Sequence, residues 1–100
     1  MSDTLREAAA ALRRTGDGLA DLGAGLTALD PGPRAFGADL PGAPGELTRQ
    51  LHVLLRDALQ ARSREAAAHG ARIASTADAV ARAAGHYDDV DADARARTVP

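Results

Sequence analysis

The chain has no cysteine, no tryptophan and no lysine, and it holds one tyrosine and one phenylalanine among its 100 residues. Without cysteine there is no disulfide and no thiolate metal site. The three histidines, His52, His69 and His86, lack the i, i+4 spacing of a helical metal site, so we expect no bound metal. Aromatic residues make up only 2% of the chain, and alanine is its main apolar residue, so a core built from one chain would be thin. Association with another chain is the remaining support for so short a sequence.

The charge pattern excludes several classes of function. The net charge is −2, every one of the 12 basic residues is arginine, and acidic and basic residues are mixed, which argues against nucleic-acid binding. No run approaches the roughly 18 apolar residues of a membrane span, so we expect no stable membrane insertion. No charged segment followed by an apolar one marks a general secretory signal peptide. Catalytic signatures such as G-x-S-x-G or a P-loop are also absent. We therefore expect no enzymatic activity, no catalytic residues and no cofactor.

Leucine and alanine favour helix, and their spacing predicts a first helix over residues 3–29. Ser2 or Asp3 can cap it, and Thr4 with Glu7 fits a capping box. In a heptad repeat, Leu5, Leu12, Leu19 and Leu26 occupy the a positions, and Ala8, Thr15, Leu22 and Leu29 occupy the d positions. This spacing predicts a coiled-coil seam, meaning the apolar stripe that faces a partner helix.

Small residues flank this predicted seam on both sides. The e and g positions hold Ala9, Ala11, Gly16, Gly18, Gly23 and Gly25. Each glycine inside a helix costs roughly 0.5–1 kcal/mol relative to alanine, a cost that close helix packing can offset. Other helices could then approach from both sides. The alternative is that the segment from Thr15 to Gly18 breaks the helix in two.

The connection is predicted over residues 30–45. Asp30-Pro31-Gly32-Pro33 ends the first helix because proline cannot continue it. Phe36 and Leu40 are expected to fold back onto the helix ends, and Phe36 with Gly37 is predicted to anchor the loop.

A second helix is predicted over residues 46–91. One stripe comprises Leu47, Leu51, Leu54 and Ala58. A second register comprises Leu55, Leu59, Ala66, His69, Ile73, Thr76, Val80, Ala83, Tyr87 and Val90. At 1.5 Å per residue the two helices would be about 40 Å and about 67 Å long, so the second would outrun the first. Residues 1–92 are thus predicted to form a helical hairpin, and residues 93–100 a flexible tail.

The segment from His86 to Asp91 contains a Y-x-x-x-D pattern. Tyr87, the only tyrosine, and Asp91 are spaced i, i+4, so on a helix they share a face. A receptor can read such a pair with an apolar pocket and an arginine or backbone donors. The alternative is a packing role for Tyr87. The neighbouring aspartates do not match a calcium-binding loop and are interpreted as a solvated acidic end.

On these features the chain resembles type VII secretion substrates of the WXG100 superfamily, and most closely the EspC-like branch. Those proteins are alanine-rich helical hairpins of similar length without cysteine, and they carry a Y-x-x-x-D/E export signal at the end of the second helix. Here Tyr87 and Asp91 match that signal. The tryptophan of the WXG turn is missing, whereas Phe36-Gly37 stands in the loop where the EspC-like branch often has Phe-Gly.

The resemblance implies an all-α antiparallel hairpin that pairs into a four-helix bundle. The expected bundle interface comprises Leu5, Leu12, Leu19, Leu22, Leu26, Leu29, Leu51, Leu55, Leu59, Ile73 and Val80. The expected partner is an identical chain, another helical hairpin or the helical N-terminus of an effector, and a secretion ATPase would engage the signal. The protein would be cytoplasmic before export and secreted without a cleavable signal peptide. Two alternatives are a cytosolic adaptor that holds a toxin or effector and, more weakly, a membrane-surface protein.

Overall fold

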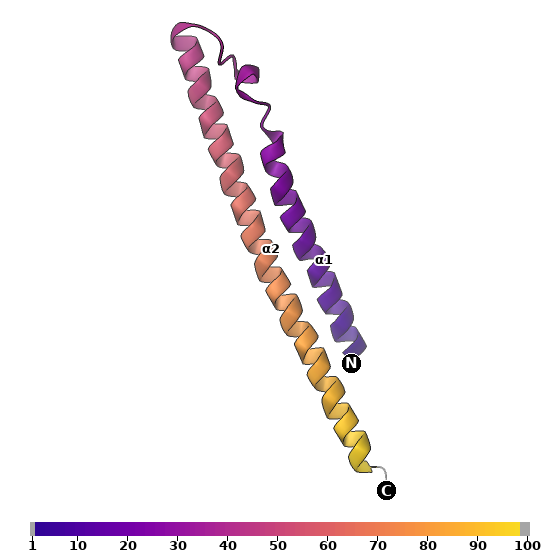
Figure 1. The fold of residues 1–100 in the computed structure, drawn as a ribbon. Helices are drawn as coiled ribbons and strands as arrows, with labels where there is room; N and C mark the ends of the chain where they lie inside the picture. The colour runs from indigo at the N-terminus through magenta and orange to yellow at the C-terminus, as the bar shows by residue number, and fades with distance from the viewer. Residues whose placement is uncertain (1, 99–100) are drawn as a thin grey trace. The chain divides into compact units, whose positions relative to one another are not determined.

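The computed structural model describes residues 2–98, which form two α-helices and two short 3-10 helices (Figure 1). Helix α1 spans Ser2–Leu26 and is followed by η1, Thr27–Leu29. The connection contains η2, Pro33–Phe36, and leads into α2, Gly42–Thr98. The prediction of an all-α helical hairpin is confirmed.

The chain forms two compact units, and both α-helices contribute to each of them. The loop unit comprises Leu19–Ala68, and the terminal unit comprises the residues up to Gly18 with those from His69 onward. In the terminal unit Arg6 pairs with Asp88 and Arg13 with Asp78, so residue numbers rise along α1 as they fall along α2. In the loop unit Gly23 lies against Ser63 and Ala66, and Asp30 contacts His52. The helical segments are therefore antiparallel within each unit.

The contact stripe of α1 differs in part from the predicted seam. The a-position leucines are half-buried, as expected, but the second buried column holds small residues at the e positions: Ala9, Gly16 and Gly23. The predicted d-position residues Ala8, Thr15, Leu22 and Leu29 are all exposed. The hairpin by itself leaves these four residues uncovered, and their predicted role in pairing with another hairpin stays a prediction.

Helix α2 shows the same displacement. Gly70, Ala77 and Ala84 are buried, whereas the predicted seam residues one position earlier, His69, Thr76 and Ala83, are exposed. The other predicted column is retained, with Leu59, Ala66, Ile73 and Val80 half-buried. Each helix thus combines a column of mostly branched residues with a column of glycine and alanine. From here on, the seam means the residues through which the two helices meet in the structure. It comprises both columns of each helix, together with Gly45, Thr48, His52 and Leu55 of α2.

The columns of glycine and alanine occupy the helix contact because the backbones of α1 and α2 approach closely there. A Cβ atom at Gly16 would lie 3.0 Å from the carbonyl oxygen of Gly70 and 3.4 Å from Cγ2 of Ile73. At Gly23 it would lie 2.9 Å from Cβ of Ala66. A leucine column at this contact would hold the helices apart, while glycine lets main chain and branched side chains meet. The alternative of a helix break between Thr15 and Gly18 does not occur, because α1 is continuous.

The resulting core is as thin as the composition suggested. Among residues 2–98 the buried apolar residues are Ala9, Ala77 and Ala84, and no large side chain is fully enclosed. Alanine buries little apolar area, so each contributes little to folding.

Three helix boundaries differ from prediction. The α-helical part of the first helix ends at Leu26, although η1 carries helical backbone on to Leu29. Helix α2 begins at Gly42 instead of residue 46 and continues to Thr98 instead of ending at residue 91. Positions 93–98 of the predicted tail are therefore helical, and the last two lie outside the described residues. Within residues 2–98 no helix is both long and apolar enough to cross a membrane.

Candidate functional site

Tyr87 and Asp91 lie one helical turn apart on α2, in the terminal unit. Tyr87 continues the column of Ile73 and Val80 at seven-residue intervals, but it is 46% exposed, whereas Val80 is half-buried. Asp91 is exposed. The last buried residue of α2 is Ala84, so the pair follows directly after the end of the core. The helix brings the two predicted residues onto one accessible face.

The start of α1 is held beside this pair through Asp88. Arg6 donates a hydrogen bond to the carboxylate of Asp88, the residue that follows Tyr87. The pKa of Asp88 is lowered, first by a hydrogen bond from the Ser2 side chain and next, beyond an opposing effect of burial, by the positive charge of Arg6 and its hydrogen bond. The His86 and Tyr87 rings have centroids 6.3 Å apart. Sequence reasoning missed the Arg6–Asp88 pair because 82 positions separate its members.

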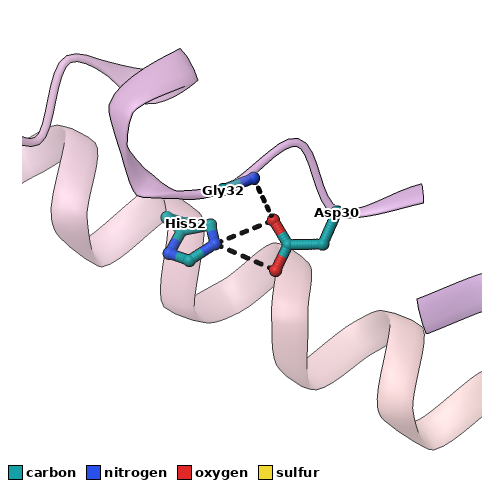
Figure 2. Close-up of polar contacts among 3 residues, drawn as sticks. All are labelled: Asp30, Gly32 and His52. Atoms are coloured by element: carbon teal, nitrogen blue, oxygen red, sulfur yellow. Dashed lines mark hydrogen bonds and ion pairs between the residues drawn. The ribbon is translucent and has the colours of Figure 1, made fainter. Parts of the chain in front are cut away.

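A second polar cluster joins the interhelical connection to α2 (Figure 2). Nε2 of His52 lies 2.8 Å and 3.0 Å from the two carboxylate oxygens of Asp30. The same carboxylate accepts a hydrogen bond of 2.9 Å from the Gly32 amide. We call Asp30, Gly32 and His52 the loop clamp.

The clamp is largely shielded from water. The His52 side chain is 11% exposed and that of Asp30 is 20% exposed. The Phe36 ring lies 5.5 Å from the imidazole between centroids, so it covers one side of the contact. The pKa of Asp30 is lowered, first by the Gly32 amide and next, beyond an opposing effect of burial, by His52 and Arg56. The Asp30 carboxylate therefore stays ionised and binds both the Gly32 amide and the His52 imidazole.

Sequence reasoning missed the role of His52 in the core. This side chain is buried, because His52 occupies the α2 column that continues as Leu59 and Ala66 at seven-residue spacing. That spacing is the signal that could have found it. Phe36 is half-buried against His52, and Gly37 ends η2 with a φ of 76°, a conformation that favours glycine. His69, predicted to lie on the seam, is exposed.

The loop unit also leaves large apolar side chains uncovered. The exposed ones in this unit are Leu22, Leu29, Leu40, Leu47, Leu51, Val53 and Leu54. Leu22, Leu29 and Leu51 belong to the predicted bundle interface, so the hairpin itself does not use them. The predicted interface residues that do lie in the seam are the a-position leucines of α1 and Leu55, Leu59, Ile73 and Val80 of α2. No family model, curated protein or solved structure matches the chain.

Proposed function

We propose that this protein is an export substrate or co-secretion partner of a type VII (ESX-like) secretion system, recognised through Tyr87 and Asp91. The observation that carries the proposal is the accessibility of this pair, one helical turn apart, just after the last buried residue of α2. The resemblance to EspC-like proteins supports the same role, since their export signal has this spacing. The role is recognition and not chemistry.

Recognition would use the two chemistries that the pair offers. The half-exposed phenol ring supplies an apolar surface, and the carboxylate one turn later accepts hydrogen bonds from an arginine or from backbone amides. The pairing of Arg6 with Asp88 keeps the beginning of α1 beside Tyr87. A secretion ATPase is the partner that we propose for this surface.

The second part of the proposal is that the hairpin forms half of a four-helix bundle. Seven large apolar side chains of the loop unit are exposed, among them Leu22, Leu29 and Leu51 of the predicted bundle interface. A partner hairpin that covers the exposed leucines would remove such surface from water.

The test is a secretion assay in a bacterium that has a type VII system. Tyr87→Ala and Asp91→Ala are each expected to lower the amount in the culture filtrate by about tenfold or more, because each removes one of the two recognition groups. Val90→Ala is the matched control, since Val90 lies between them and is 48% exposed. Circular dichroism should show equal helix content in all variants. Undiminished export of Tyr87→Ala would refute the signal.

A cytosolic adaptor is the second candidate, and the exposed leucines of the loop unit favour it. A surface of this kind also suits the helical N-terminus of a toxin or effector. The two roles differ in where the protein accumulates. Mass spectrometry of culture filtrate and cell lysate separates them, since an adaptor stays in the lysate while its client is exported.

A further inference from the structure

Tyr87 and Asp91 lie on the side of α2 that packs against α1. Tyr87 follows Val80 at seven-residue spacing, in the column of mostly branched residues. Asp91 follows Ala77 and Ala84 at the same spacing, in the column of glycine and alanine. Both are exposed, whereas the residues before them in these columns are buried or half-buried. The exposed surface of the signal therefore begins where the contact with α1 ends.

The first turn of α1 lies at this boundary. Helix α1 begins at Ser2, which is half-buried and one helical turn before Arg6. The carboxylate of Asp88 accepts hydrogen bonds from the side chains of both residues. Asp88 directly follows Tyr87 and is half-buried, whereas residues 89–98 are all exposed. The first turn of α1 is thus joined to α2 directly beside the signal.

The carboxylates near Tyr87 differ in their accessibility to a receptor. A step of four residues on a helix is a rotation of about 40°, and a step of one residue is about 100°. Asp91 therefore shares the face of Tyr87, while Asp88 lies further round the helix, where Arg6 binds it. With Asp88 paired, Asp91 is the carboxylate that a receptor cation meets beside the phenol ring.

The position of the first turn of α1 also affects Tyr87 itself. Tyr87 is 46% exposed, so about half of its surface is covered by the chain. Helix ends open more readily than helix centres, because their backbone groups lack helical partners. A restraint at the start of α1 keeps this end closed and holds the edge of the signal in one arrangement. Such preorganisation lowers the cost of ordering the surface when a receptor binds.

A second ion pair of the same kind provides an internal comparison. Arg13 of α1 pairs with Asp78 of α2, and their side chains are 52% and 52% exposed, against 50% and 44% for Arg6 and Asp88. Both pairs join the same two helices within the terminal unit. Exposed ion pairs of this kind contribute little to global stability. Ten residues separate the two aspartates, or about 15 Å along α2, so only the Arg6–Asp88 pair adjoins the signal.

We propose that Arg6 and Asp88 are positioning residues of the export signal. Their ion pair holds the first turn of α1 at the edge of Tyr87 and so fixes the surface that the receptor meets. The inference rests on the proposed export function and deepens it, because it extends the signal from two residues of α2 to a contact between both helices.

Exchange of the two charges tests the inference in the secretion assay. Arg6→Asp and Asp88→Arg each place like charges opposite one another, and each should lower export by about fivefold or more. The double variant with both changes restores the ion pair in reverse, and its export should return to within about twofold of wild type. A double variant that stays as defective as the single ones would mean that the receptor reads Asp88 directly, which would overturn the positioning role.

The Arg13–Asp78 pair supplies the matched control. Arg13→Asp and Asp78→Arg create the same repulsion between the same helices, but far from Tyr87, and export should stay within about twofold of wild type. Circular dichroism should show similar helix content for all four single variants. If disruption of either pair lowered export equally, the Arg6–Asp88 pair would have only a structural role and the inference would fail.

Tyrosine fluorescence gives a measurement that does not depend on export. Tyr87 is the only tyrosine and the chain has no tryptophan, so its emission reports on the signal alone. Quenching by acrylamide should become about 1.5-fold or more stronger in Arg6→Asp, because the first turn of α1 opens. It should return to the wild-type value in the double variant and stay there in Arg13→Asp. Equal quenching in Arg6→Asp and wild type would contradict the positioning role.

The secretion assay also distinguishes this inference from the proposed function. Undiminished export of Tyr87→Ala would refute the signal and this inference with it. Export that is lost in Tyr87→Ala but unchanged in Arg6→Asp would overturn the inference alone and leave the signal standing.

Discussion

The imidazole of His52 binds both carboxylate oxygens of Asp30, and this contact joins the interhelical connection to α2. Removing the ring by His52→Ala should lower the thermal unfolding midpoint by several degrees, because the carboxylate loses a shielded hydrogen-bond partner. His69→Ala is the control, since His69 is an exposed histidine on the same helix. Circular dichroism melts of both variants measure the difference. Equal melts would mean that the clamp contributes nothing to stability.

The two lowered aspartate pKa values predict acid sensitivity. The pKa values of Asp30 and Asp88 both lie below the ordinary value of 3.8. A carboxyl with a depressed pKa in the folded state contributes stability above its unfolded pKa and loses it as the pH falls through the folded value. The unfolding midpoint should therefore decline below about pH 4 and be insensitive to these groups between about pH 5 and 7.

Substitution of Asp30 separates its contribution to the pH dependence of stability from general acid effects. Asp30→Asn removes one titration, so the variant should be less stable than wild type at neutral pH and should lose less stability on acidification. Asp57→Asn, at an exposed aspartate of α2, should keep the wild-type profile. Thermal melts across the pH range provide the comparison. Parallel profiles for wild type and Asp30→Asn would contradict the assignment.

The helices were predictable because leucine and alanine recur at helical spacing, and the a-position leucines pointed to the correct face of α1. The sequence does not reveal which neighbouring column completes that face. The choice depends on how closely two backbones approach, and Gly16 and Gly23 permit an approach that a d-position column containing Leu22 would prevent.

The tertiary contacts could not be predicted from the sequence, also for a physical reason. The clamp joins residues 22 positions apart, and the Arg6–Asp88 pair can be found only once the antiparallel register is known. The position at which α2 ends was mispredicted for a different reason. Its polarity suggested a tail, although alanine and arginine are strong helix formers and continue the helix to Thr98.

The two glycines near the middle of α1 should respond oppositely to alanine. A Cβ atom at Gly18 meets nothing within 4 Å, so Gly18→Ala should stabilise the protein by about 0.5–1 kcal/mol through helix propensity. At Gly16 the added carbon would lie 3.0 Å from a carbonyl oxygen of α2, so the helices must separate and the gain is lost. In urea unfolding, the free energy of unfolding of Gly16→Ala should be lower than that of Gly18→Ala by at least about 1 kcal/mol. An equal gain at both positions would contradict the close approach.

Two adjacent alanines of α2 test the register of the seam. Ala84 is 0% exposed, whereas Ala83, which the heptad pattern assigned to the seam, is exposed. Ala84→Leu forces three extra carbons between the helices and should cost about 1–3 kcal/mol of unfolding free energy. Ala83→Leu adds the same volume to the surface and should change that free energy by no more than about 0.5 kcal/mol. The chemistry of the two substitutions is identical, so helix propensity cancels in the comparison. If Ala83→Leu were the more damaging change, α2 would have to be rotated to the column that the leucine pattern alone predicted.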